Sequence, residues 1–168
     1  AIKGGVPNEK IVFHGNNKSD KELEFAVRNN IKVIVDNDYD LERLEEISNS
    51  LNRDLEIMIR FTPGIECHTH DYIRTGSFDS KFGFGIEYLN TLFEKISKTK
   101  HLKLKGLHAH IGSQIFELDP HKDLGEIMVN IILDAKKFGH DIQKLNVGGG
   151  LGIKYTEDDD PPSIDEWV

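Results

Sequence analysis

Residues 106–114 read GLHAHIGSQ, and this stretch joins the end of a predicted strand to a glycine-led turn. Side chains in a strand alternate between its two faces, so Leu104, His108 and His110 are expected on the same face. A glycine that permits a sharp turn and a serine with a free hydroxyl follow directly. Two imidazoles at the end of one strand therefore indicate a functional site. The alternative is a pair of core histidines that hydrogen-bond to backbone carbonyls.

Short strands rich in β-branched residues alternate with amphipathic helices along the chain. The predicted strands are residues 11–14, 31–36, 55–61, 102–110 and 144–147. The predicted helices lie between them, with a capping box at Ser19 and Glu22 and a long helix at about 119–138. This alternation predicts a parallel sheet with right-handed crossovers. The fold class is therefore α/β, a partial (β/α)8 TIM barrel with about five parallel strands, and an open doubly wound sheet is the alternative.

The two ends of the chain both fall in predicted helices. Residues 1–5 have the pattern of a helix end, and the sequence stops within the helix that follows Ser163. Five strands cannot close an eight-stranded barrel and would leave two open sheet edges. We therefore expect residues 1–168 to be an internal segment of a larger barrel domain.

Composition disfavours several classes of protein. The 168 residues carry 29 acidic and 21 basic side chains, a formal net charge of −8, which argues against a nucleic-acid surface. The sequence has neither an apolar run long enough to span a membrane nor a signal-peptide pattern. Cys67 is the single cysteine and cannot form an internal disulfide, so a cytoplasmic location is expected. Without an obvious base beside it, Cys67 fits a passive thiol better than a nucleophile.

A glycine triplet follows the last predicted strand. The triplet Gly148–Gly150 allows backbone amides to converge on an anion, and a cofactor phosphate is a common ligand of such loops. A plain tight turn is the alternative. The preceding strand also ends in a glycine and a serine, Gly112 and Ser113, so two neighbouring loops can offer donors to one phosphate.

Two further candidates follow the third strand. Arg60 ends that strand among apolar neighbours, where a guanidinium needs an anionic partner, either a bound ligand or a structural carboxylate. His68 and His70 lie in a long polar loop, and metal binding there is conceivable. No third and fourth ligand have metal-site spacing, which favours solvated loop residues.

Several segments together resemble the diaminopimelate decarboxylases, which belong to the alanine-racemase-like, pyridoxal-phosphate-dependent decarboxylases. The resemblance covers essentially the whole chain in the family's order, with segments HGNNKS (14–19), TPG (62–64), HTH (68–70), DSKFG (79–83), HAHIGSQ (108–114) and VGGGLG (147–152). It implies a (β/α)8 barrel followed by a C-terminal β domain, and a homodimer with active sites at the subunit interface, near which Lys81 would lie. Residues 1–168 would then lack the N-terminal strands, the last strand and the β domain.

The resemblance also implies roles for individual residues. His110 would act in catalysis by stacking on the pyridine ring of pyridoxal 5'-phosphate, and His108 would support it. Ser113 and residues 148–150 would bind the cofactor phosphate, and Arg60 would lie near the polar edge of the ring. The implied reaction converts meso-2,6-diaminopimelate, a small amino-acid substrate, to L-lysine and carbon dioxide.

The sequence departs from the family pattern in ways that affect function. The lysine that binds the cofactor covalently lies upstream in the family, and Lys18 follows a different strand. The Glu-Pro-Gly-Arg segment and the cysteine of the β domain are also missing. We therefore expect this chain alone to be inactive. The alternatives are a catalytically dead binding partner, an ornithine- or arginine-type decarboxylase, and a metal-dependent barrel hydrolase, since His-x-His at a strand end is also a metal-site pattern.

Overall fold

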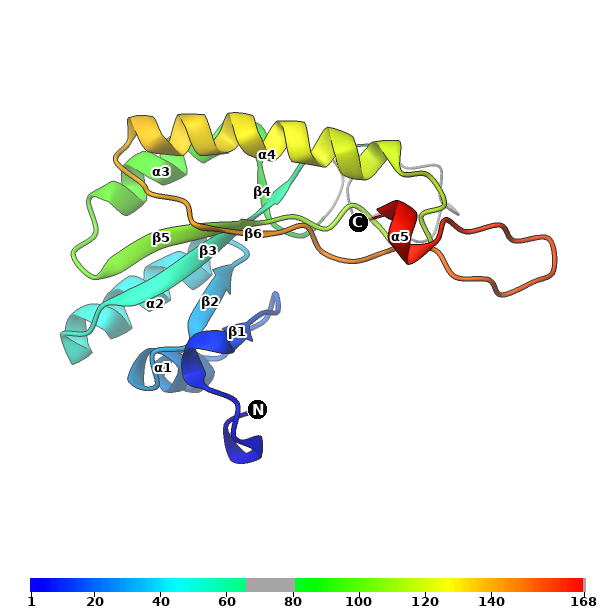
Figure 1. Ribbon diagram of the computed structural model, residues 1–168. Helices are drawn as coiled ribbons and strands as arrows, with labels where there is room; N and C mark the ends of the chain where they lie inside the picture. The colour runs from blue at the N-terminus through cyan, green and yellow to red at the C-terminus, as the bar shows by residue number, and fades with distance from the viewer. Residues whose placement is uncertain (66–80, 168) are drawn as a thin grey trace.

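The fold is built on one parallel sheet, seen in a computed structural model that describes residues 1–65 and 81–167 (Figure 1). The strands are β1 (Val12–Phe13), β2 (Lys32–Val35), β3 (Leu55–Thr62), β4 (Phe84–Gly85), β5 (Leu102–His108) and β6 (Lys144–Asn146). Their spatial order is β1-β2-β3-β5-β6, and β4 pairs with the end of β3. All the pairings are parallel, as the alternation of elements predicts.

Helices connect the strands and cover one face of the sheet. They are α1 (Asp20–Arg28), α2 (Asp38–Leu51), α3 (Leu89–Ser97), α4 (Asp119–Lys137) and α5 (Ile164–Trp167). The part of the chain that the structure describes also contains 3₁₀ turns at Ile2–Gly4, Asn8–Lys10 and Ile86–Tyr88. In Figure 1 the sheet curls and the longer helices follow its outer side. This half-barrel confirms the predicted partial (β/α)8 architecture, whereas a doubly wound sheet would carry helices on both faces.

Local sequence signals explain where the helices begin. Ser19 and Glu22 form the predicted capping box, in which the Glu22 backbone N–H donates to the Ser19 side chain and the Ser19 N–H to the Glu22 carboxylate. Asn37 caps α2 in the same way by accepting from the Asp40 backbone N–H. Both caps follow a strand closely, so they fix the angle at which each helix returns along the sheet.

The hydrophobic core lies between the sheet and the helices. All four residues of β2 are buried, which explains why every one of them except Lys32 is apolar. Leu23 of α1, Leu44 of α2 and Phe93 of α3 are fully buried in one cluster with the outward-facing strand residues. This layer holds the strand ends in place.

The strict alternation predicted for β5 is wrong at one position. Ile57 pairs with Leu104, but the next residue, Met58, pairs with Gly106, so β5 carries one extra residue at Lys105. Leu104 consequently joins Leu107 in the helix-facing core instead of sharing a face with His108. The bulge changes which way the end of β5 presents its side chains, and no sequence pattern signals it.

The opposite, concave face of the sheet carries side chains in layers. Lys32 and Lys144 both lie near Glu56 at the beginning of the strands, with Nζ–Oε2 distances of 3.9 and 2.8 Å. An apolar layer with Met58 comes next, where Gly106 leaves room for the methionine side chain. The strand ends carry the polar groups described below. Charged, apolar and polar layers thus succeed one another along the strands.

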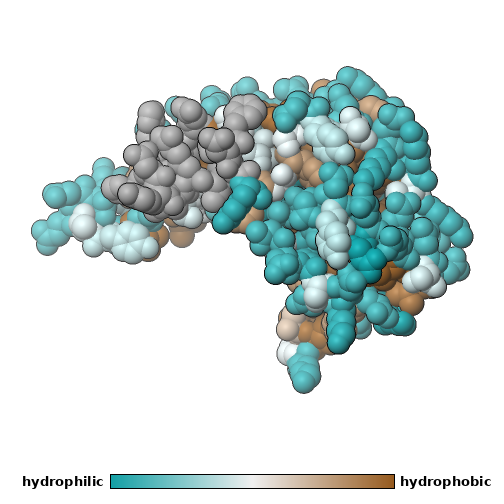
Figure 2. Space-filling view, turned by 180° about the vertical axis from the view of Figure 1, so that it is seen from behind, coloured by the Kyte–Doolittle hydropathy of each residue, from teal (hydrophilic) through white to brown (hydrophobic). Residues whose placement is uncertain are grey.

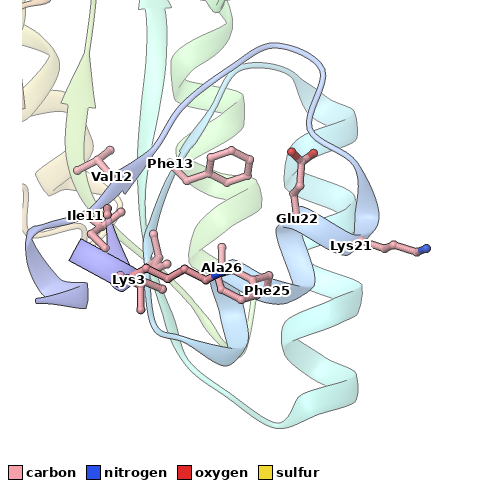
Figure 3. Close-up of a pocket in the computed structure, with 11 residues that line it drawn as sticks. Lys3, Ile11, Val12, Phe13, Lys21, Glu22, Phe25 and Ala26 are labelled. Atoms are coloured by element: carbon pink, nitrogen blue, oxygen red, sulfur yellow. The ribbon is translucent and has the colours of Figure 1, made fainter. Parts of the chain in front are cut away.

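An apolar groove runs beside the edge strand β1. It has a volume of about 630 Å³ and lies between β1 and α1, with Val12, Phe13 and Phe25 among its lining residues (Figure 3). Hydrophobic surface is also visible at the lower end of the molecule in Figure 2, on the side of the N-terminal segment. The groove shares no lining residue with the polar strand ends, so it is separate from the candidate site.

Strand and helix positions agree with the sequence predictions to within a few residues, with one addition. The short strand β4 was not predicted and lies at the end of a stretch expected to be loop. Within residues 1–65 and 81–167, no helix combines the length and apolar character needed to cross a bilayer. Cys67, His68 and His70, together with the segment 66–80, lie outside the described residues.

Candidate active site

The carboxyl ends of neighbouring strands bring the predicted site residues together. Arg60 pairs with His108 across β3 and β5, and His108 pairs with Asn146 across β5 and β6. Asp36 follows β2 directly, beside the end of β3. Parallel strands end at the same edge of a sheet, so four polar side chains form one row there.

Arg60 has a carboxylate partner within the chain. Its guanidinium donates to Asp36 Oδ1 at 3.1 Å, and the two side chains are 10% and 2% exposed. The guanidinium also lies 4.7 Å from the centre of the Phe82 ring, a cation–π arrangement. Gly83 packs against the Arg60 backbone, where a Cβ atom would be 3.0 Å from the Arg60 carbonyl oxygen. Arg60 is therefore held rigidly by a structural ion pair, the second of its two predicted partners.

A second buried ion pair supports the first. Lys18 forms an ion pair with Asp40, and their side chains are only 1% and 2% exposed. Asp40 Oδ2 also accepts the backbone N–H of Asp36 at 3.0 Å, and Lys18 donates to the Gly15 carbonyl. The loop after β1 is thus tied to the carboxylate that holds Arg60. Removing one partner of such a buried pair leaves an uncompensated charge.

His108 lies deep in the row and is only 4% exposed. Its Nδ1 lies 3.0 Å from the Asn146 carbonyl oxygen, which can only accept, so Nδ1 carries the proton and Nε2 has the free lone pair. Desolvation by burial is the main cause that lowers the pKa of His108 to about 4. The ring is therefore neutral at pH 7 with a defined tautomer.

His14, the residue that follows β1, packs against His108. Their ring centres are 4.6 Å apart and their planes are nearly perpendicular, at 87°. The Gly15 backbone N–H donates to His14 Nδ1 at 2.6 Å, so the neutral ring carries its proton on Nε2. Desolvation lowers the pKa of His14, followed by the positive charge of Arg60.

His110 joins the two glycine-rich loops. The Gly149 backbone N–H donates to His110 Nδ1 at 3.3 Å, so the proton of the neutral ring is on Nε2. Desolvation, then Arg60 and His121, lower the pKa of His110. The charge of Arg60 thus helps to lower the pKa of all three imidazoles, and a backbone group sets the tautomer of each neutral ring.

The loops after β5 and β6 pack too closely for a side chain at Gly148 or Gly150. A Cβ atom on Gly150, which has φ of +113°, would lie 2.0 Å from the Gly112 carbonyl oxygen. The Ile115 N–H donates to the Gly150 carbonyl, and the Gly152 N–H donates to the Ile115 carbonyl, both at 2.8 Å. Ser113 is partly buried within this paired segment. The two loops therefore lie side by side, as the phosphate interpretation requires.

Sequence reasoning missed His121, on the first turn of α4. Its ring makes a perpendicular contact with the Trp167 ring at 5.5 Å, and it lies close enough to His110 to affect its pKa. Burial lowers the pKa of His121, and a backbone contact with Gly149 opposes this shift. The only signal in the sequence is a histidine near the start of a helix that follows the GSQ turn.

A family model described as "Pyridoxal-dependent decarboxylase, pyridoxal binding domain" matches residues 1–168, the whole chain. The chain belongs to this family. The pyridoxal-binding domain assignment confirms the cofactor predicted from the sequence motifs.

Relatives in this family share much of the sequence. A diaminopimelate decarboxylase of Synechocystis is 55% identical over 160 residues, which is 95% of this chain and 34% of the relative. The diaminopimelate decarboxylase of Bacillus subtilis is 41% identical over 172 residues, covering 100% of this chain and 39% of the relative. The chain thus spans between a third and two fifths of the length of these curated relatives.

Solved structures agree with this assignment. Diaminopimelate decarboxylase from Helicobacter pylori in complex with L-lysine superposes with a TM-score of 0.91 at 33% identity, covering 99% of this chain and 42% of that one. An arginine decarboxylase of Paramecium bursaria Chlorella virus superposes with a TM-score of 0.76 at 18% identity, which reflects the fold alone. The half-barrel described above therefore has the fold of the corresponding part of the barrel in this pyridoxal-binding family.

The geometry of the pyridoxal-binding domain fits its cofactor. The Gly148–Gly150 loop approaches the 110–113 turn closely, whereas a Cβ atom on Gly149 would meet nothing within 4 Å, so the loop has open space beside a backbone amide. The His110 ring borders the same space through its bond to Gly149. Among the described residues, no group of three or more His, Cys, Asp or Glu side chains is arranged to hold a metal ion.

Proposed function

We propose that the full-length protein containing this chain decarboxylates meso-2,6-diaminopimelate to L-lysine and carbon dioxide, with pyridoxal 5'-phosphate as cofactor. The hydrogen bond between Gly149 and His110 carries the proposal, because it joins the two motif loops around one space. Similarity to diaminopimelate decarboxylases, up to 55% identity, favours this substrate over ornithine or arginine. The cofactor, when bound, supplies the electron sink that accepts the charge left when the carboxylate departs.

We propose the following roles for the residues of the site. His110 stacks on the cofactor ring, with its ring orientation fixed by Gly149. Ser113 and the loop of Gly148–Gly150 bind the phosphate, since glycine-rich loops can direct backbone amides toward an anion. Arg60 lies at the polar edge of the ring, and His108 supports the site from the layer below.

The neutral state of the imidazoles fits this arrangement. A protonated His110 beside Arg60 would place two positive charges together in a partly buried site, and burial together with Arg60 disfavours that state. Arg60 in turn keeps its charge and position through Asp36. The site therefore offers one fixed positive charge and neutral aromatic faces to a bound ring.

We also propose that residues 1–168 form the central part of the pyridoxal-binding barrel, and that the full-length protein is a cytoplasmic homodimer. Coverage supports the first part of this proposal, since the chain matches only 34% to 39% of the length of the first relatives. The homodimer is what the family resemblance implies, and the cytoplasmic location is inferred from the single cysteine. The lysine that attaches the cofactor covalently would then lie outside this chain.

The test uses the full-length protein and the isolated chain side by side. We expect the full-length protein with pyridoxal phosphate to release lysine and carbon dioxide from meso-diaminopimelate, with little product from ornithine or arginine. Borohydride reduction followed by peptide mapping should label one lysine outside residues 1–168 and none inside. Labelling of Lys18, or turnover by the isolated chain, would contradict the proposal. A full-length protein that binds the cofactor but turns over none of the three amino acids would support a catalytically dead binding partner.

A further inference from the structure

His14 is a polar residue beside the row of strand-end side chains, and the proposed function gives it no role. It follows the edge strand β1, outside both glycine-rich loops, and it is exposed. Its ring nevertheless makes a defined contact, with its centre 4.6 Å from that of His108 and its plane almost perpendicular. Such an edge-to-face arrangement is the favoured geometry for aromatic pairs.

The His14 ring is held from its own side by the backbone. The Gly15 N–H donates to His14 Nδ1, and the Gly15 carbonyl accepts from Lys18. Lys18 is in turn fixed by Asp40, a buried residue of α2. One peptide unit therefore connects the His14 ring to a buried ion pair, so the ring has little freedom to turn away from His108.

His108 is held from its opposite side by β6. Its Nδ1–H donates to the Asn146 carbonyl at 3.0 Å. Asn146 thus holds the Nδ1 side of the His108 ring, through its carbonyl and through a contact of its side chain. The His14 ring packs against His108 from the end of β1, so the His108 ring has contacts with residues from both the first and the last strand of the sheet.

We propose that His14 is a positioning residue of the pyridoxal-binding site, whose ring braces His108 in place beside Arg60. This inference rests on the proposed function only in assigning the site to the cofactor. His14 lies at the end of β1, apart in sequence from both glycine-rich loops, and its ring contact is with His108, through which it acts. The aromatic ring, and not the proton that it carries, is the feature that matters.

Several charged and titratable groups at the strand ends act on this pair. The groups that act on His14 besides His108 are Arg60, Asp36, Lys18 and His110. Desolvation is the main cause that lowers the pKa of His108 to about 4, with His14 and Arg60 adding to it. Loss of the His14 ring admits water to His108 and should move its pKa back toward 6.5.

The experiment measures His108 directly in the cofactor-free, full-length protein. Deuterium exchange at the imidazole C2 atom, followed by peptide mass spectrometry, reports the accessibility and pKa of each histidine. We expect His14→Ala to speed exchange at His108 at least fivefold at pH 8 and to weaken pyridoxal phosphate binding about three- to tenfold. His14→Phe keeps the ring edge and should restore both values to within about twofold of the wild type.

A second replacement separates the ring from its polar atoms. His14→Gln keeps an acceptor for the Gly15 N–H but removes the ring, so it should resemble His14→Ala. Unchanged exchange at His108 in His14→Ala, or recovery by Gln as complete as that by Phe, would overturn the proposal. If His14→Ala does not fold, comparing the exchange rate at His108 between His14→Phe and His14→Gln tests the same point. The readout requires no substrate, so a failed decarboxylase assay would count against the proposed function and not against this inference.

Discussion

Gly148 lies directly against His110. A Cβ atom on Gly148 would be 2.7 Å from His110 Nδ1 and 2.8 Å from the Ala109 carbonyl oxygen, and the glycine has φ of +79°. The backbone of one loop thus forms the wall against which the imidazole of the other rests. Position 148 requires glycine for two reasons: its backbone has a positive φ, and there is no room for a side chain.

Gly148→Ala should therefore destabilise the cofactor-free, full-length protein. The left-handed conformation alone costs an alanine about 1–2 kcal/mol, and the contact with His110 adds to this cost. We expect a thermal midpoint several degrees below that of the wild type, measured by circular dichroism. Gly149→Ala is the matched control, because its Cβ atom would meet nothing within 4 Å and the midpoint should not change. Equal midpoints for the two variants would show that the loops do not pack as described.

Gly106→Ala tests the concave face of the sheet. Its Cβ atom would lie 2.7 Å from Met58 Cγ and 3.0 Å from the Lys144 carbonyl oxygen, within the apolar layer. Overpacking of this kind typically costs about 1–3 kcal/mol, so a lower thermal midpoint is expected. Gly125→Ala on the exposed side of α4 is the control, since alanine favours a helix by up to about 1 kcal/mol over glycine. Its midpoint should stay level or rise, and a drop in both variants would contradict the packing argument.

The sequence allowed the strands, helices and strand-end site to be predicted because their signals are local. The apolar run at 31–36, the Ser19 capping box and the glycine triplet each act over a few neighbouring residues. Likewise, the order of the parallel strands follows from short right-handed connections. These features needed no knowledge of contacts between distant segments.

The features that could not be predicted from the sequence depend on how distant strands align with one another. The bulge at Lys105 appears only when β5 is aligned with β3, and it reverses the face assigned to Leu104. The choice of Asp36 as the partner of Arg60 likewise depends on where two strands end relative to each other. The contact between His14 and His108 joins residues 94 positions apart in the sequence, and no local pattern predicts such a pair.

His110→Ala should weaken cofactor binding without unfolding the full-length protein. A stacked aromatic pair contributes about 0.5–1.5 kcal/mol beyond its buried area, which corresponds to a roughly three- to tenfold rise in the dissociation constant. His108→Ala should affect the affinity less, because His108 lies a layer deeper in the barrel. Cofactor titration monitored by absorbance measures both effects. A metal site would instead give equal loss of activity in both variants and sensitivity to chelators.

Acid should destabilise the protein through His108. The pKa of this ring is lowered to about 4 in the folded state by desolvation, whereas an unfolded histidine titrates near 6.5. Between these values the unfolded chain binds the extra proton, so stability falls as the pH drops from about 6.5 to about 4. The full shift corresponds to a loss on the order of 3 kcal/mol. His108→Asn, which keeps a donor for the Asn146 carbonyl, should give a flatter plot of thermal midpoint against pH, and an unchanged slope would exclude His108 as the source.

Lys18→Met should be among the most destabilising single changes at a charged residue of this chain. The substitution leaves the Asp40 carboxylate, which is only 2% exposed, without its cation. Breaking a buried ion pair typically costs about 3–5 kcal/mol, and here the loop of Gly15 loses a donor as well. Lys98→Met is the matched control, because Lys98 and Glu94 form an i, i+4 pair with side chains that are 71% and 57% exposed. Exposed pairs of this kind contribute less than about 1 kcal/mol, so the thermal midpoint of Lys98→Met should differ little from that of the wild type.

Lys18→Met and Asp40→Asn should each weaken binding of pyridoxal phosphate, since both release the loop beside His14 and the backbone of Asp36. If Lys18→Met had no more effect on the midpoint than Lys98→Met, the buried pair would not be a support of the site.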